Sequence, residues 1–265
     1  MKIITFSAIK GGVGKTTLAY NYGEWLASKG KQVLFIDLDH QCNLTQTYDV
    51  FNNEGTVANI FRGKGDVALL NVKENIDLIP GYLRLDRLEK ELETKGYKDM
   101  LLYMWLEDNY DDKGIEKYDY VIIDCHPDFS TATRNAIIVS HAVLSPVIPS
   151  EHGYQAKFNL QERLEEFKAE AFDFKTRESY VTAELFFLGN MIKHNTKSSK
   201  ELVASLTNEE NVLAMIPQKE LFNRSTLDKV SLSDMMKDKD LTRVNKEFFK
   251  DIDFTFQKIT DKISL

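Results

Sequence analysis

A glycine-rich loop lies close to the start of the chain, between an apolar segment and a helical pattern. Residues 3–7 are mostly β-branched or aromatic and have apolar residues on both faces, as in a buried parallel strand. Residues 10–17 then read Lys-Gly-Gly-Val-Gly-Lys-Thr-Thr. Beyond Thr16, apolar residues recur at three- and four-residue steps until Gly30, which predicts a helix with a glycine cap. A strand, a glycine loop and a helix in this order are typical of a phosphate-binding loop.

The alternation of short apolar strands and amphipathic helices continues along the chain. It predicts an α/β fold with a doubly wound, mostly parallel sheet and helices on both faces. The sequence shows no internal repeat, no low-complexity tract and no Pro- or Gly-rich linker, so we expect one domain over residues 1–265. Strands are expected at 33–36, 76–79, 120–124, 142–144, 184–192 and 212–216, helices at 83–92, 97–106, 160–174, 199–206 and 241–263, and an acidic loop at 107–112.

Composition narrows the class of protein. An apolar fraction of 43% is ample for a core, and the net charge of -7 gives no global positive field for nucleic acid, so any DNA contact must be a local patch. Two cysteines, Cys42 and Cys125, form neither a disulfide framework nor metal-ligand spacing, which favours a reducing cytoplasm. No run approaches the roughly 20 apolar residues of a membrane-spanning helix. We therefore expect a cytoplasmic protein without membrane contact.

The loop carries the groups that bind a nucleoside triphosphate. Its glycines let successive backbone N–H groups converge on phosphate oxygens, next to the positive end of a helix dipole. Lys15 would contact the β- and γ-phosphates, and the Thr16 hydroxyl would bind magnesium. The alternative is a tight strand-to-helix connection that holds no ligand. The predicted nucleotide-binding set is Lys10, Gly11, Gly12, Val13, Gly14, Lys15, Thr16 and Thr17.

The loop departs from the usual Gly-x-x-x-x-Gly-Lys-Thr pattern, because Ile9 stands where the first glycine is required. The same stretch fits Lys-Gly-Gly-x-Gly-Lys-Thr-Thr at every fixed position, and so resembles the deviant Walker A loop of the ParA and MinD family. That resemblance implies an ATPase that forms a homodimer on ATP, with Lys10 reaching across to the partner's nucleotide. A second cation near the γ-phosphate would offset charge that develops during transfer.

Three aspartates follow predicted strands, at the sheet edge where open α/β sheets bind ligands. Asp124 resembles the Walker B aspartate, which holds magnesium through water. In the family an Asp-x-Asp-x-Gln segment follows the second strand, which implies that Asp37 supports the metal and Asp39 orients the attacking water. A strand-end aspartate is otherwise commonly a helix cap or a turn former. The predicted catalytic set is Lys10, Lys15 and Asp39, and the predicted metal set is Thr16, Asp37 and Asp124.

Other segments match or depart from the family. Asn21 falls where the first helix of the family usually has an asparagine. Gly189-Asn190-Met191 and Ile216-Pro217 look like the segments that flank adenine, so Asn190 and the Pro217 backbone are candidates for base recognition, although Asn190 could equally cap a turn. The departures are His40 in place of proline, Cys42 in place of glycine, and His126 in place of the first of two prolines. An isolated histidine is more often a loop residue than a catalyst.

The resemblance is strongest to the ParA partition ATPases, and it implies a function. Their ATP-bound dimer binds nonspecific DNA, and a ParB-like centromere-binding partner stimulates hydrolysis, so the protein would associate with the nucleoid when ATP is bound. No helix-turn-helix precedes the loop, so sequence-specific operator binding is not expected. An ordinary charged surface is the alternative interpretation of the candidate DNA contacts, which are Lys193, Lys197, Lys200, Lys219, Arg224 and Lys229.

Two alternatives stay open. The first is a membrane-associated positioning ATPase similar to MinD, which localises through a basic amphipathic helix at its C-terminal end; here residues 254–265 are partly amphipathic but contain only two lysines. The second is a module that binds ATP without hydrolysing it.

Overall fold

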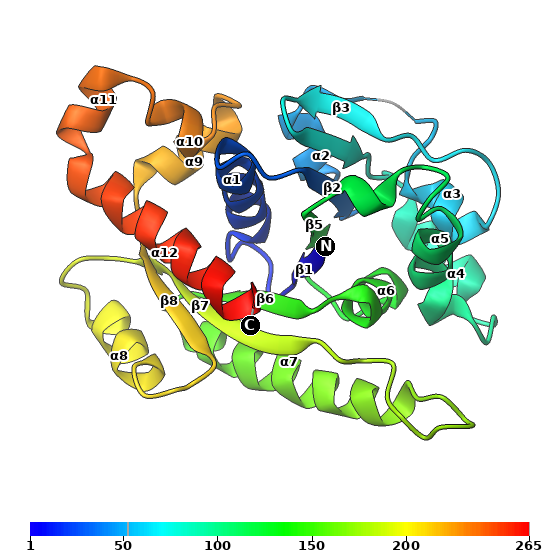
Figure 1. Cartoon of the computed structure of the whole chain (residues 1–265). Coiled ribbons are helices and arrows are strands. Elements are labelled where there is room, and N and C mark those ends of the chain that lie inside the picture. The colour runs from blue at the N-terminus through cyan, green and yellow to red at the C-terminus, as the bar shows by residue number, and fades with distance from the viewer. Residues whose placement is uncertain (52, 265) are drawn as a thin grey trace.

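The computed structural model describes residues 1–51 and 53–264, and in these ranges it leaves out the side chains at positions 151 and 152. Its strands form a single sheet in the order β3-β4-β2-β5-β1-β6-β7-β8 (Figure 1). β3 pairs antiparallel with β4, and the other neighbouring strands pair in parallel. The predicted doubly wound, mostly parallel sheet is thereby confirmed. The strands are β1 (Lys2–Phe6), β2 (Val33–Leu38), β3 (Leu70–Lys73), β4 (Ile76–Ile79), β5 (Tyr120–Cys125), β6 (Ala142–Val147), β7 (Glu184–Ile192) and β8 (Val212–Pro217).

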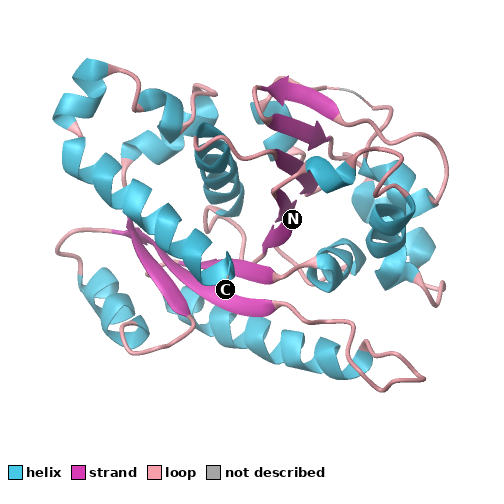
Figure 2. Cartoon of the chain, viewed as in Figure 1, coloured by secondary structure: helices cyan, strands magenta, loops and turns pink. Residues whose placement is uncertain are grey.

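Helices cover both faces of this sheet (Figure 2). They are α1 (Lys15–Ser28), α2 (Asn43–Thr47), α3 (Val57–Arg62), α4 (Leu85–Leu92), α5 (Leu101–Asp108), α6 (Thr131–Val139), α7 (Glu151–Glu170), α8 (Lys197–Leu206), α9 (Glu220–Leu227), α10 (Leu232–Met235), α11 (Lys239–Val244) and α12 (Lys246–Ser264). Two 3-10 turns, Lys98–Met100 and Ile115–Lys117, precede α5 and β5.

The two-residue period of each strand divides its side chains between the two helical layers. On β2, Val33 and Phe35 belong to the core on the side of α1 and α12, whereas Leu34 and Ile36 belong to the core on the side of α3 to α6. Because both faces are covered, every residue of β2, β5 and β6 is buried. This explains why these strands appear in the sequence as continuous apolar runs.

The strand register brings the predicted functional residues to one edge. In the parallel pairs, Asp124 of β5 stands opposite both Phe6 of β1 and Asp37 of β2. The phosphate loop, which follows Phe6, therefore leaves the sheet beside both aspartates. This geometry follows from strand pairing between segments that are about 85 to 120 residues apart in sequence.

Some predicted boundaries are wrong. The helix expected at 160–174 is α7, which begins at Glu151 and ends at Glu170. The helix expected at 241–263 is interrupted at Asn245, whose non-helical backbone separates α11 from α12. The strand expected to stop at Leu144 continues through Pro146, because β1 pairs with β6 only as far as Leu144 and the missing N–H of proline disrupts no bond on that side.

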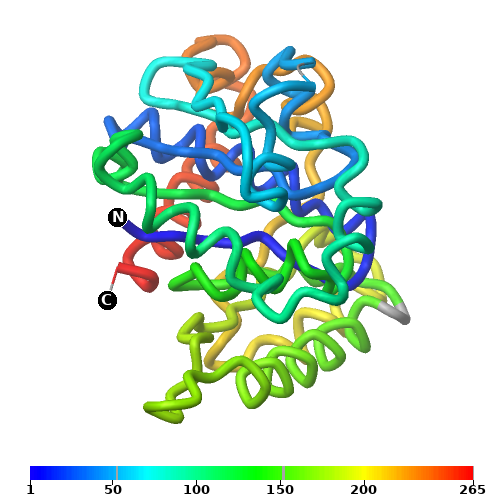
Figure 3. The backbone as a smooth tube through the Cα atoms, turned by 90° about the vertical axis from the view of Figure 1, so that its right-hand side faces the viewer, coloured from blue at the N-terminus to red at the C-terminus, as the bar shows by residue number. Residues whose placement is uncertain are grey.

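The last helix packs its apolar side into the core rather than presenting it to solvent. The buried residues of α12 repeat at helical spacing, and the end of this helix lies on the same side of the molecule as the N-terminus (Figure 3). Among the described residues, none of the helices combines the length and the apolar character that crossing a bilayer requires. The buried residues are Phe249, Ile252, Phe256, Ile259 and Ile263.

Candidate nucleotide-binding site

The glycines of the loop between β1 and α1 adopt backbone conformations that other residues rarely accept. Gly12 and Gly14 have φ angles of +71° and +90°. Gly14 also caps α1, and a Cβ at this position would lie 2.6 Å from Nδ2 of Asn190. No described side chain caps the helix, so its first N–H groups and its dipole are free to bind an anion.

A cavity of about 640 Å³ opens at this loop. Its walls bring together the loop, Asp39 after β2 and Pro127 after β5, three segments that are far apart in sequence. The predicted loop residues Gly11, Gly12, Gly14, Lys15, Thr16 and Thr17 line it. The volume is within the range of ordinary small-ligand sites, roughly 300–1,000 Å³.

Lys15 is a buried cation on the cavity wall, with 6% of the residue exposed. Burial lowers the pKa of its ammonium group, and the carboxylates of Asp124 and Asp39 act against that shift. Within the described ranges Lys15 has no ion-pair partner at contact distance. A desolvated ammonium group of this kind binds an anionic ligand strongly.

Asp37 is fully buried at the end of β2, and the surrounding chain holds it in place. Its Oδ2 accepts hydrogen bonds from the Thr45 backbone N–H at 2.9 Å and from the Thr45 hydroxyl at 2.6 Å, and its Oδ1 accepts one from the Asp39 N–H at 3.1 Å. Burial nevertheless raises the pKa of Asp37 to about 6. Thr45 lies on the short helix α2, which the sequence pattern did not predict.

Asp124 is also fully buried, but neither of its carboxylate oxygens has a hydrogen-bond partner in the described part of the chain. Burial and the neighbouring charge of Asp37 raise its pKa well above the ordinary value, while the nearby Thr16 hydroxyl and the Lys15 ammonium group act in the opposite direction. A buried carboxylate without partners is costly unless a cation balances it. Two buried aspartates beside the Thr16 hydroxyl provide the oxygen donors that magnesium prefers, so these residues fit that ion.

Asp39 occupies a different position from the other two aspartates. It lies on the cavity wall, and its Oδ1 accepts a hydrogen bond from the Gln41 N–H at 2.8 Å. Its carboxylate is therefore held at one oxygen and faces the space beside the phosphate loop. Gln41 lines the same cavity.

Lys10 does not line the cavity of its own chain. Its Nζ donates a hydrogen bond to the Ser150 hydroxyl at 2.8 Å, in the connection between β6 and α7. Within one chain, the two lysines of the loop thus have separate environments, because Lys15 lies at the phosphate cavity and Lys10 lies on an adjacent connection.

A smaller cavity of about 90 Å³ adjoins the loop and contains both predicted base contacts, Asn190 and Pro217. Asn190 is 5% exposed, and its Nδ2 donates a hydrogen bond to the Val13 carbonyl at 2.8 Å. Asn190 thus fixes the phosphate loop and has its Oδ1 left for a ligand. Phe222 and Asn223 of α9 complete the wall, and no local pattern in the sequence predicted that helix or its position.

The six basic residues considered for DNA come after β7 and β8, which are parallel neighbours in the sheet. Lys197 pairs with Glu201 at 3.7 Å, Arg224 with Asp228 at 2.9 Å, and Lys229 with Asp49. Lys193 and Lys200 are exposed. Lys219 lines the smaller cavity and Lys229 the larger one, so both lie at the candidate nucleotide site.

Comparison with known proteins supports the resemblance. Residues 1–176 match a family model described as an AAA domain. The chain is 35% identical over 158 residues to the sporulation initiation inhibitor protein Soj of Bacillus subtilis, a match that covers 55% of this chain and 58% of Soj. It is 33% identical over 159 residues to the chromosome partitioning protein ParA of Caulobacter vibrioides, covering 56% of each. The matched region thus spans little more than half of these relatives.

Similarity to solved structures extends over nearly the whole chain. A putative plasmid partition protein of Borrelia burgdorferi, crystallised with AMPPNP, superposes with a TM-score of 0.79 at 25% identity, over 98% of this chain and 99% of that protein. The ATP complex of a variant of McdA from Cyanothece has a TM-score of 0.81 at 20% identity, over 100% and 97% of the two chains, and shows the shared fold. The two-lysine phosphate loop, the sheet order and these matches agree, and the chain belongs to the ParA/MinD family of P-loop ATPases.

Proposed function

We propose that this protein is a ParA-type partition ATPase. It dimerises on ATP, binds nonspecific DNA in that state, and hydrolyses ATP to segregate plasmid or chromosomal DNA with a ParB-like centromere-binding partner. Its cofactors are ATP and Mg²⁺. The observation that carries this proposal is the phosphate loop itself, where Lys15 lies buried and the Asp124 carboxylate, which has no hydrogen-bond partner in the described part of the chain, lies at the neighbouring strand end.

The site residues divide into those that bind and those that direct the reaction. The N–H groups of the loop and Lys15 hold the β- and γ-phosphates, and Thr16, Asp37 and Asp124 hold magnesium, directly or through water. When bound, the metal neutralises charge on the phosphate oxygens. Asp39 accepts a hydrogen bond from the attacking water and aims it at the γ-phosphorus. Such positioning and charge compensation supply most of the catalysis in phosphoryl transfer.

Lys10 supplies the second cation from the partner subunit. Its side chain is directed at Ser150 and is absent from the cavity of its own chain, which is consistent with a role in trans. Closure of two subunits over two nucleotides would exchange the Ser150 hydrogen bond for a contact with the partner's γ-phosphate. Since only ATP offers that phosphate, hydrolysis removes the contact and favours release.

Base recognition and DNA binding use the neighbouring strands β7 and β8. We assign Asn190 and the Pro217 backbone to adenine, since both line the small cavity beside the loop. The six basic residues after these strands contribute to a DNA surface of the dimer by neutralising phosphates. In this proposal the 265 residues act as one ATPase domain, and the protein is cytoplasmic and associates with the nucleoid while ATP is bound.

DNA retention tests this function directly. Random duplex DNA is immobilised, and retention of the protein is measured with ATP and Mg²⁺, with ADP, and without nucleotide. We expect retention with ATP only, and its loss in Lys10→Ala, which cannot stabilise the closed dimer. Retention that ignores the nucleotide would contradict the partition function.

A second measurement distinguishes an ATPase from a module that binds ATP without turnover. We expect Asp39→Ala to lose hydrolysis by at least about 100-fold while keeping nucleotide-dependent dimerisation, because the carboxylate acts on the attacking water and not on the bound phosphates. Phosphate release and sedimentation velocity measure the two effects. Unchanged turnover would remove Asp39 from the mechanism.

A further inference from the structure

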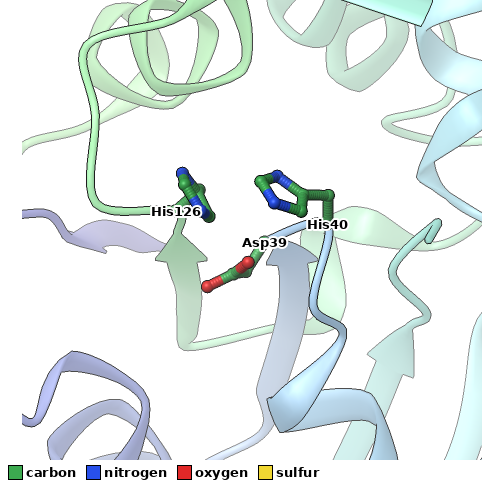
Figure 4. A group of neighbouring side chains, drawn as sticks. All are labelled: Asp39, His40 and His126. Atoms are coloured by element: carbon green, nitrogen blue, oxygen red, sulfur yellow. The ribbon is translucent and has the colours of Figure 1, made fainter. Parts of the chain in front are cut away.

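Two histidines leave the sheet side by side at the edge of the nucleotide site. His40 follows β2 and His126 follows β5, and the register pairs Leu38 with Cys125 at the ends of these strands. Their imidazole rings lie 3.9 Å apart between centroids, inclined by 30° (Figure 4). Neither ring lines the phosphate cavity. The sequence showed them only as two separate departures from the family pattern, so their pairing is a product of the fold.

Asp39 brings a carboxylate to the same place. Asp39, His40 and His126 each contribute one possible ligand atom, a carboxylate oxygen or a ring nitrogen, and these three atoms lie within 4.8 Å of one another (Figure 4). Two imidazole nitrogens and one carboxylate oxygen are a donor set for zinc and neighbouring transition metals. Tetrahedral ligands bonded at about 2.1 Å lie roughly 3.4 Å apart, so the side chains must approach by about an ångström, which small side-chain rotations can supply.

The surroundings orient the donors and favour a cation. Nδ1 of His126 lies 3.2 Å from Oδ2 of Asp128. When Nδ1–H donates to that carboxylate, Nε2 carries the free lone pair, as in the carboxylate–histidine–zinc arrangement of many metal sites. The Gln41 N–H holds Oδ1 of Asp39 at 2.8 Å. Glu89, whose Oε1 accepts a hydrogen bond from the Ala132 N–H at 2.6 Å, adds a second carboxylate near His40.

We propose that Asp39, His40 and His126 form a site for a divalent transition metal of the zinc class. This site differs from the magnesium site in its ligands. Asp37, Asp124 and Thr16 offer only oxygen donors, which suit a hard cation such as Mg²⁺. Three protein ligands leave one position for water. The Asp39 carboxylate cannot both bind this metal and orient the attacking water, so a metal bound here should inhibit ATP hydrolysis. This consequence rests on the proposed function.

The binding test uses the untagged full chain without nucleotide, in buffer with excess magnesium. Co²⁺ is added while visible absorption is recorded, and Zn²⁺ affinity is measured by competition with a chromophoric chelator. We expect one ion per chain, with a cobalt spectrum of nitrogen and oxygen ligands and no sulfur-to-metal charge-transfer band. His40→Ala and His126→Ala should each weaken zinc binding at least about 100-fold, and Asp128→Asn about 10-fold.

His194→Ala provides the matched control, since His194 is exposed and lies outside the cluster. Its zinc affinity should equal that of the unaltered protein. The cobalt spectrum of the unaltered chain keeps the proposal testable even where a variant fails to fold. A thiolate band, absence of binding at tens of micromolar metal, or unchanged affinity in both cluster variants would overturn the site. None of these outcomes requires ATP hydrolysis, so they are distinguishable from failure of the partition function.

A kinetic measurement tests the role of Asp39 as a ligand. At a buffered free zinc concentration that saturates the site, ATP hydrolysis by the unaltered protein should slow at least about tenfold, and hydrolysis by His126→Ala should not. If Asp39→Ala abolishes hydrolysis, zinc that binds without slowing hydrolysis would remove Asp39 from the ligand set and overturn the three-residue site. If Asp39→Ala keeps hydrolysis, the ligand role of Asp39 is decided instead by the zinc affinity of that variant, which should fall at least about 10-fold.

Discussion

Asp37 and Asp124 are paired with each other on adjacent strands, yet their carboxylates have different hydrogen-bond environments. Asp37 accepts three hydrogen bonds, from Thr45 and from the Asp39 N–H, whereas neither oxygen of Asp124 finds a partner among the described residues. A buried charge without partners lowers stability unless a ligand balances it. The buried carboxylate of Asp124 therefore lowers the free energy of unfolding of the ligand-free protein, and binding of a cation raises it again.

The first prediction concerns the stability of Asp124→Asn without magnesium. The pKa of Asp124 is raised in the folded chain above its ordinary value of 3.8, so the folded state holds the proton more tightly than the unfolded state. The stability of the unaltered protein falls as the pH rises above about 4 towards the folded-state pKa. The asparagine variant lacks this penalty and should be more stable at pH 7 by about 1–3 kcal/mol, an advantage that shrinks towards pH 4.

Urea unfolding of both proteins across pH 4 to 8 measures this difference. Magnesium with ATP should reverse the order at pH 7, because only the unaltered protein gains stability from the metal. A stability difference that does not change with pH would show that Asp124 is not held as a buried carboxylate.

The second prediction concerns two glycines with similar backbones in different surroundings. Gly14→Ala should weaken nucleotide binding at least about 10-fold, because its Cβ would meet Nδ2 of Asn190 and disturb the hydrogen bond that fixes the loop. Gly30→Ala has a comparably strained φ of +80° but open space around the added carbon. It should cost about 1 kcal/mol of stability and leave the affinity for a fluorescent ATP analogue unchanged. Equal losses of affinity would mean that backbone strain, not the contact with Asn190, is responsible.

At the scale of elements, α1 connects the phosphate loop to the C-terminal helices. Asn21, fully buried on α1, donates from Nδ2 to the Ser225 hydroxyl at 2.8 Å and accepts at Oδ1 from the Leu232 N–H at 2.8 Å. One side chain thus joins α1 to α9 and α10, and α9 forms a wall of the small cavity. The family resemblance placed an asparagine here, and the structure supplies a physical reason for it.

The third prediction follows from this connection. Asn21→Ala should lower the free energy of unfolding by about 2–4 kcal/mol, because it leaves the buried Leu232 N–H without a partner and removes the hydrogen bond that the Ser225 hydroxyl accepts. Gln257→Ala is the control, since that exposed side chain bonds only to Asp261 on the surface of α12 and should change stability by less than about 0.5 kcal/mol. Chemical denaturation gives both values. A loss below about 1 kcal/mol for Asn21→Ala would show that the connection is not structurally important.

At the scale of the whole molecule, α12 returns the end of the chain to its beginning. Phe256 contacts the rings of Tyr22 and Trp25 on α1, and the indole Nε1–H of Trp25 donates to Asp253 at 2.8 Å. The apolar side that a membrane-binding helix would need is thus committed to the core.

The fourth prediction compares two phenylalanines of α12. Phe256→Ala should destabilise the protein by about 3–5 kcal/mol, because it leaves a cavity against α1. Phe254, which is 70% exposed, should tolerate the same change with a loss below about 0.5 kcal/mol. ATP should not bring the unaltered protein onto anionic liposomes in a flotation assay. ATP-dependent flotation abolished by Phe254→Ala would instead favour a membrane role for this helix.

The parts predicted well are those that short-range pattern encodes. The loop, β7 at Glu184–Ile192 and the strand ends at Asp37 and Asp124 follow from residues that are neighbours in sequence. The helices α2 and α9 escaped prediction because they are short, yet they supply Thr45 and a wall of the small cavity. Their positions depend on packing against α1 and β2 rather than on their own residues.

The sequence by itself predicted a phosphate-binding glycine loop with two lysines and a mostly parallel sheet that presents this loop, since glycine conformations, apolar runs and helical spacing are local properties. Only the tertiary structure decided what surrounds the loop. It left Asp124 without partners among the described residues, directed Lys10 to Ser150, placed α12 in the core, and brought His40 against His126. Each of these arrangements depends on residues distant in sequence, and the free energy that selects them comes from packing of the whole sheet and its helices.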